Sequence, residues 1–202
     1  VIVNRLWQHH LGRGIVRTPS DFGTQGAAPT HPELLDYLAA ELIRGDWKLK
    51  PIHQLIMKSS VYRQAGQNNE LATGIDPENS LWWRRGATRL EAEVIRDTFL
   101  AVSGSLDKTM FGKGSLDQAN PRRSIYLTVK RSNLIPILQL FDAPDSIQSI
   151  GHRDVTTVPP QALALMNSPL TRQLAEKFAK RIYASGETTM EQVVNQAYIL
   201  AL

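Results

Sequence analysis

Cysteine is absent from the sequence. Its absence excludes disulfide bonds, zinc sites with thiolate ligands, cysteine nucleophiles and covalent haem attachment through a C-x-x-C-H motif. No apolar run reaches the roughly 18 residues that a membrane-spanning helix requires. We therefore expect no cofactor bound through thiolates and no transmembrane segment.

Strong charge of either sign is also lacking. The 202 residues carry 23 basic and 19 acidic side chains, which gives a formal net charge of +4. A positive balance this small is compatible with binding to nucleic acid or to anionic glycans but requires neither, so the composition does not favour nucleic acid. Hydrophobic residues make up 42% of the chain, which is typical of a globular protein with a genuine core.

Known catalytic signatures are missing as well. His152, Arg153 and Asp154 match the first letters of a kinase catalytic loop, but no asparagine follows at the required spacing and no glycine-rich phosphate loop is present. No serine stands in a G-x-S-x-G nucleophile elbow. We interpret the kinase match as chance, and whether the chain is an enzyme stays open at this point.

Helical periodicity is what the sequence does contain. Apolar residues recur at helical spacing in about eight segments. Two long loops, over residues 12–31 and 142–158, interrupt this pattern. Thr30 and Glu33 have the spacing of a capping box before the helix that follows. A helix from about residue 90 is expected to turn Leu90, Val94, Ile95 and Leu100 inward. Residues 124–131 are β-branched and aromatic in their middle and predict one short strand or β-ribbon.

These patterns predict a mainly α fold, a multi-helical single domain over residues 1–202 with two long ordered loops. The first residues are apolar without a cap, and an apolar stripe runs through Met190, Val194 and Tyr198 to the end of the chain. We therefore expect a piece of a longer multidomain protein. We also expect its termini to contact a neighbouring domain or a second copy of the chain in a homodimer.

The candidate site residues come from the two long loops and their edges, because loops this long in a compact domain are usually functional or disordered. His9 and His10 are adjacent, so their side chains point about 100° apart on a helix and cannot share a metal ion by themselves. We expect no metal, and His10 to pack beneath the loop. The ligand-binding candidates are His10, Arg17, Asp21, His31, Arg153 and Asp154. Arg17, Asp21, Arg153 and Asp154 could pair with one another.

Six long motifs together resemble a known family. They are NRLWQHHLGRGIVRTPSDFGTQGAAPTHPELLDYLA, LIMKSSVYRQ, RLEAEVIRDTFLAVSG, RRSIYLTVKR, LFDAPD and RDVTTVPPQALALMNSP. In this order they resemble a planctomycete-type domain of unknown function at the C-terminal end of large secreted proteins. The resemblance implies an extracytoplasmic location and, in a neighbouring domain, a cytochrome-c-like haem module. Some relatives have a cysteine where this chain has Ile150, Gly151 and His152, which weakens a redox role for that loop.

The sequence leaves two functional hypotheses. The first is an accessory or binding module of a larger exported protein, which contacts a neighbouring domain or an extracellular ligand such as polysaccharide and holds no cofactor of its own. The alternative is a hydrolase or metal-dependent enzyme with a site between the two long loops. The resemblance supplies no catalytic residues for either hypothesis.

Overall fold

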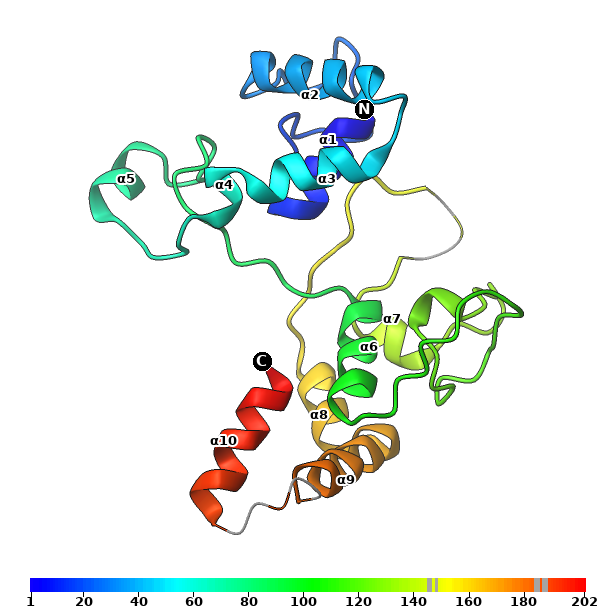
Figure 1. Cartoon of the computed structure of the whole chain (residues 1–202). Helices are drawn as coiled ribbons and strands as arrows, with labels where there is room; N and C mark the ends of the chain where they lie inside the picture. Colours follow the sequence, from blue (N-terminus) through cyan, green and yellow to red (C-terminus); the bar gives the residue numbers. More distant parts are fainter. Residues whose placement is uncertain (145–146, 148, 184–185, 187–188) are drawn as a thin grey trace. The chain divides into compact units, whose positions relative to one another are not determined.

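A computed structural model describes residues 1–144, 147, 149–183, 186 and 189–202 (Figure 1). The described residues contain ten α-helices and one short 3₁₀ helix, so the mainly α prediction is confirmed. Contacts divide the chain into two compact units, Val1–Arg89 and Leu90–Leu202, which we call unit 1 and unit 2. That the 202 residues act as one domain stays a prediction. Among the described residues, no helix is long and apolar enough to cross a membrane.

Unit 1 is built on three helices that contact one another in pairs, α1 (Ile2–Leu11), α2 (Pro32–Arg44) and α3 (Leu49–Lys58) (Figure 1). Two short helices follow, α4 (Ser60–Arg63) and α5 (Glu70–Ile75). Each of the three long helices turns one apolar stripe inward, as their periodicity predicts. The core they enclose consists of Val3, Trp7, Leu11, Ile15, Leu38, Leu42, Ile52, Ile56 and Trp82.

The periodicity of Ile52, Leu55 and Ile56 predicts one helix to about Tyr62, and residues 65–80 predict a surface loop, so unit 1 has two more helices than expected. Ser59 explains one of them. Its backbone is extended, with φ −67° and ψ 153°, and this breaks the expected helix into α3 and α4. The Ser59 hydroxyl donates to the carbonyl of Ile56 at 2.6 Å and accepts from the backbone N–H of Tyr62 at 3.3 Å. One serine side chain therefore satisfies both helix ends at the break. The other additional helix, α5, lies in a polar stretch without helical periodicity.

The first long loop of unit 1 is ordered because a buried asparagine holds it. The Asn4 side chain donates to the carbonyl of Val16 at 3.1 Å and accepts from the Val16 N–H at 2.8 Å. A Cβ at Gly14 would lie 2.6 Å from this side chain, so only glycine fits there. Thr30 donates its hydroxyl to the carbonyl of Ile15 at 3.3 Å, so the predicted capping box is wrong and α2 begins after His31 without a side-chain cap.

Unit 2 is organised around α6 (Ala92–Val102), which contacts the 3₁₀ helix η1 (Ser124–Tyr126), α7 (Pro136–Leu140) and α9 (Pro169–Tyr183). The helix α8 (Pro159–Asn167) precedes α9, and α10 (Met190–Ala201) packs on α9. No residue of α10 is buried, and Met190 and Tyr198 are well exposed. The expected contact of the termini with another domain or a second copy stays a prediction. Residues 145, 146 and 148 of the second long loop lie outside the described residues.

The predicted strand at residues 124–131 is wrong. Ser124–Tyr126 form a 3₁₀ turn, and only two isolated bridges occur in the part of the chain that the structure describes, Asp107 to Arg122 and Ser115 to Leu127. The Asp97 carboxylate accepts hydrogen bonds from the backbone N–H and the hydroxyl of Ser124, at 2.7 and 2.6 Å. This anchor fixes the segment in a turn, whereas a strand would need a partner along its whole length.

The predicted buried face of α6 is confirmed at Leu100, which is 3% exposed, but is wrong at two other positions. Leu90 and Val94 are exposed, whereas Arg96 is only 1% exposed. Its guanidinium donates to the carbonyls of Gln118 (3.1 and 3.0 Å), Asn120 and Arg122 (3.0 Å) and to the Ser124 hydroxyl (3.1 Å). The three carbonyls lie in a stretch outside any helix, so the guanidinium supplies the hydrogen bonds that a helix or sheet would otherwise provide.

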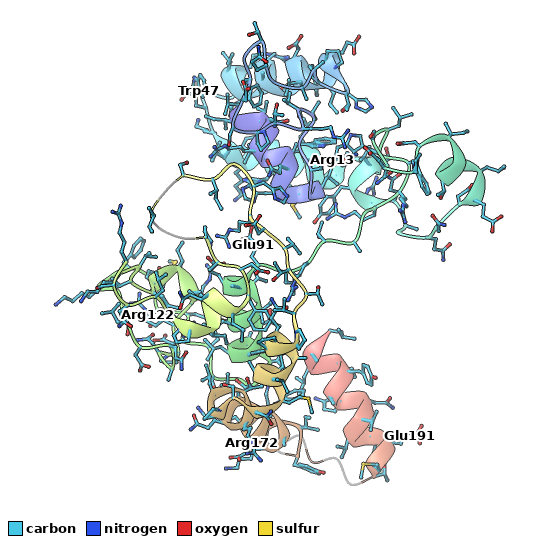
Figure 2. The ribbon with its side chains drawn as sticks, turned by 180° about the vertical axis from the view of Figure 1, so that it is seen from behind. Arg13, Trp47, Glu91, Arg122, Arg172 and Glu191 are labelled. Carbon is cyan, nitrogen blue, oxygen red and sulfur yellow. The ribbon has the colours of Figure 1, made fainter. Side chains whose placement is uncertain are left out.

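Replacing Arg96 by Lys should destabilise unit 2. An ammonium group has three donors on a flexible stem and cannot span four acceptors arranged for a planar fork, so buried carbonyls would lose their partners. We expect the free energy of unfolding, measured with urea, to fall by about 2–4 kcal/mol. Arg172→Lys on the exposed face of α9 (labelled in Figure 2) is the matched control and should change it by less than about 0.5 kcal/mol. Equal losses in the two variants would contradict the role given to Arg96.

Candidate functional site

Unit 2 contains a cavity of about 120 Å³, which we call the unit 2 cleft. It lies between α6, the segment after η1, α7 and the start of the second long loop. An apolar cavity of about 150 Å³ is large enough to bind benzene, so this one has room for a single branched side chain. The lining residues are Glu93, Ser124, Leu127, Thr128, Val129, Leu134, Ile135, Leu138, Gln139, Ala143 and Pro144.

The walls of the cleft are mainly aliphatic, and its mouth is on the surface. Leu127 and Ile135 are buried at its base, whereas Val129 and Gln139 are exposed. The Ser124 hydroxyl is already engaged by Arg96 and Asp97, as described above. The geometry therefore offers apolar contact to a ligand, with few polar groups to orient it.

An ion pair borders the cleft at Glu93. Arg153 donates through Nη1 to Glu93 Oε2 at 2.6 Å and through Nη2 to Glu93 Oε1 at 3.1 Å, a two-pronged contact that fixes both side chains. Glu91 Oε2 lies 3.5 Å from the same Nη1. Burial alone would raise the pKa of Glu93, but the hydrogen bond from Arg153, a hydrogen bond from the backbone N–H of Glu93 and the charge of Arg153 together outweigh it and lower that pKa. The carboxylate is therefore ionised at neutral pH and poorly suited to donate a proton.

Arg153 was among the residues predicted from the sequence, whereas Glu93 was missed. The only signal for Glu93 was a second carboxylate close to Glu91 at the start of a helix. Acidic residues are common at this position because they interact favourably with the helix dipole. The pKa of Arg153 is raised, first by its hydrogen bond to Glu93. Asp154, the neighbouring candidate, is exposed.

The candidates in unit 1 have separate partners. Arg17 Nη2 lies 2.6 Å from Glu78 Oε2, and both side chains are largely exposed, at 48% and 60%. Asp21 accepts the backbone N–H of Gly23 at 2.9 Å and so stabilises a turn. A ring nitrogen of His31 lies 3.0 Å from the Thr30 hydroxyl. Arg17 and Arg153 thus each bind a glutamate that the sequence did not single out, rather than the aspartates expected to pair with them.

His10 is packed, as the sequence interpretation expects, but its partners lie in α3 and α4 rather than in the first long loop. A hydrogen bond of 2.8 Å joins His10 Nε2 and His53 Nδ1, and the Tyr62 ring lies edge-on with its centroid 5.7 Å away. Arg85 lies over the Tyr62 ring at 4.3 Å. Within the described residues, no group of three or more histidine or acidic side chains is placed to hold a metal ion. That the chain binds no metal stays a prediction.

Acid should weaken unit 1 through the histidine pair. Burial, followed by the charges of His53, Arg85 and His9, lowers the pKa of His10 from its ordinary value of 6.5. The unfolded chain therefore binds a proton at this site before the folded chain does, so stability is full above about pH 6.5 and falls as the pH drops below it. We expect His10→Gln to flatten this dependence, with a slope change of at most about 1.4 kcal/mol per pH unit.

The test is to measure the free energy of unfolding with urea at several pH values between neutral and mildly acidic. Its slope against pH is then compared between variants. The exposed His152→Gln variant is the control, because it removes an imidazole from unit 2 and leaves the groups that act on His10 unchanged. An unchanged slope in His10→Gln would rule out His10 as the titrating group.

Replacing Arg153 by lysine should lower the free energy of unfolding more than replacing Arg17 by lysine. Arg153→Lys loses a two-pronged contact that is partly buried, and we expect the free energy of unfolding to fall by about 1 kcal/mol. Arg17→Lys replaces a single exposed contact, and should change it by less than about 0.5 kcal/mol. Thermal unfolding of both variants beside the unmodified chain tests this, and a larger loss in Arg17→Lys would show that the order is wrong.

The comparisons with known proteins place the chain in one family. A model for proteins of unknown function, PSD1 (DUF1553), matches residues 1–202. No curated protein and no solved structure matches the chain. The resemblance drawn from the six motifs is thereby confirmed as a domain of unknown function, while the planctomycete type and the haem association stay predictions. Because the match extends from the first residue to the last, the chain belongs to the PSD1 (DUF1553) family of proteins of unknown function.

Proposed function

We propose that the chain is a binding module of a larger exported protein, and that the unit 2 cleft receives one apolar side chain from a neighbouring domain. The observation that carries the proposal is the cleft itself, a surface cavity of about 120 Å³ with mainly aliphatic walls. Pockets for drug-sized ligands usually occupy about 300–1,000 Å³. A cavity of this smaller size fits the anchor side chain of a protein partner, which is the usual centre of an interface.

The lining favours a protein partner over a polysaccharide. Sugar-binding sites combine flat aromatic rings with several hydrogen-bonding groups, and none of the described residues that line this cleft is aromatic. Burial of one leucine side chain is worth about 1.5–3 kcal/mol, so the cleft supplies an anchor point and the surrounding surface must supply the rest of the affinity.

The Glu93 to Arg153 pair gives the cleft a fixed polar edge. Because both Glu93 oxygens are held by Arg153, the carboxylate keeps one orientation, and its remaining lone pairs can accept an N–H from the partner's backbone. The alternative of an enzyme between the two long loops has less support, since Arg17 and Arg153 are engaged by Glu78 and Glu93. The exported setting and the haem module of a neighbouring domain rest on the family resemblance and belong to this proposal.

A capped single amino acid tests the cleft directly. We expect N-acetyl-leucine amide, titrated into the isotopically labelled chain, to shift the backbone amides of Leu127, Leu134 and Leu138, with a Kd of the order of 10 mM. Ala143→Phe fills the cleft and should abolish these shifts. Ala175→Phe adds the same ring to the exposed face of α9 and should leave them unchanged.

Two results would contradict the proposal. One is the absence of shifts at the cleft in the unmodified chain at saturating probe. The other is a set of shifts that a linear oligosaccharide produces at the same amides and the leucine amide does not, which would favour a glycan ligand.

A further inference from the structure

The net charge of the chain is concentrated in one segment of unit 2, residues 106–131. This segment holds six basic side chains and two acidic ones, so it carries the whole +4 of the protein, and the remaining sequence is balanced. Both acidic groups are used locally, since Asp107 accepts from Thr109 and Asp117 accepts from the Ala119 N–H. The basic residues are Lys108, Lys113, Arg122, Arg123, Lys130 and Arg131.

One of these basic residues, Arg122 (labelled in Figure 2), holds the segment together from within. Arg122 donates to the carbonyls of Thr109 (3.3 and 3.2 Å), Phe111 and Lys113 (3.1 Å), and its guanidinium lies 3.8 Å from the centre of the Tyr126 ring. The Tyr126 hydroxyl accepts the Phe111 N–H at 2.9 Å. Residues 108–113, which we call the tip loop, are therefore held in one conformation by hydrogen bonds to every second carbonyl.

The tip loop holds two large apolar side chains in solvent. Met110 is 67% exposed and Phe111 is 78% exposed. The backbone of Phe111 has φ +66°, a left-handed conformation that is unfavourable for an aromatic residue and persists only where the surroundings enforce it. Arg122 and Tyr126 thus stabilise a strained loop whose outermost side chains gain nothing from the fold.

Exposed lysines flank this apolar pair. Lys108 and Lys113 bound the tip loop, and Lys130 and Arg131 follow the braced segment; all four are exposed and form no ion pair within the described residues. Two apolar side chains between the exposed cations Lys108 and Lys113 match a surface that is apolar inside and negatively charged outside. An anionic glycan or a nucleic acid would satisfy the cations but would offer no apolar phase for Met110.

We propose that the tip loop binds the surface of an anionic lipid bilayer. Met110 and Phe111 enter the boundary between headgroups and acyl chains, while Lys108 and Lys113 contact lipid phosphates and carboxylates. Arg122 is a positioning residue, because its donors are directed to the loop's own carbonyls. The inference is independent of the unit 2 cleft, since a membrane surface and an anchor side chain use different residues.

Co-sedimentation with lipid vesicles tests the proposal. We expect the unmodified chain to bind phosphatidylcholine vesicles that contain phosphatidylserine, to bind pure phosphatidylcholine at least tenfold more weakly, and to lose affinity as salt is added. Phe111→Asn removes the ring with a residue that tolerates the left-handed backbone, and should reduce binding about tenfold or more. Lys108→Gln with Lys113→Gln should reduce it about 25-fold, because each cation near the surface contributes roughly fivefold.

Matched controls come from unit 1. Leu71→Asn removes an apolar side chain that is 81% exposed, and Lys50→Gln with Lys58→Gln removes two exposed cations; both should bind like the unmodified chain. Urea unfolding confirms that each variant is folded. No binding to phosphatidylserine vesicles, or equal loss in the tip-loop and control variants, overturns the proposal. Binding to heparin with none to vesicles also overturns it, in favour of a glycan.

Discussion

The buried guanidinium of Arg96 is the interaction on which unit 2 depends. A charged group is stable in a protein interior only if its hydrogen bonds are satisfied, and here three backbone carbonyls and one hydroxyl satisfy them. The benefit is mutual, because the carbonyls of residues 118–122 have no helix or sheet to bond to. Removing either side would leave the other buried and unsatisfied. A long irregular segment can therefore keep one conformation without regular secondary structure.

The same face of α6 carries the other two groups that organise unit 2. Glu93, Arg96 and Asp97 are spaced three and four residues apart, so their side chains leave the helix on one side. Asp97 fixes Ser124 and with it one wall of the cleft, and Glu93 holds Arg153 of the second long loop. The chain of restraints extends further outward through Arg122, which holds the tip loop. Arginine recurs at these positions because its planar fork can hold several carbonyl or carboxylate oxygens at fixed angles.

In unit 1 a neutral side chain, that of Asn4, supplies the hydrogen bonds that an irregular segment needs. Asn4 uses both its amide donor and its carbonyl acceptor on Val16, so the buried start of a loop of about twenty residues has hydrogen-bond partners for its backbone. The contrast accounts for the proposed roles. Unit 1 is a packed three-helix core, whereas unit 2 presents both a surface cavity and an exposed apolar loop. The functional proposals for this member of the PSD1 (DUF1553) family therefore concern unit 2.

The sequence by itself determined the mainly α fold and the inward stripes of α1, α2 and α3, because helical periodicity depends only on which residues are apolar. It also indicated that His10 packs and that Arg153 would bind a carboxylate. Only the tertiary structure decided which carboxylates pair with Arg17 and Arg153, since Glu78 and Glu93 are each about sixty residues away in the chain. The strand predicted at residues 124–131 was wrong for the same reason, because local sequence does not show which distant residues a segment will contact. The residues there have strand propensity, but the contacts that override it come from Arg96 and Asp97, more than twenty residues earlier, and propensity does not record such distant partners.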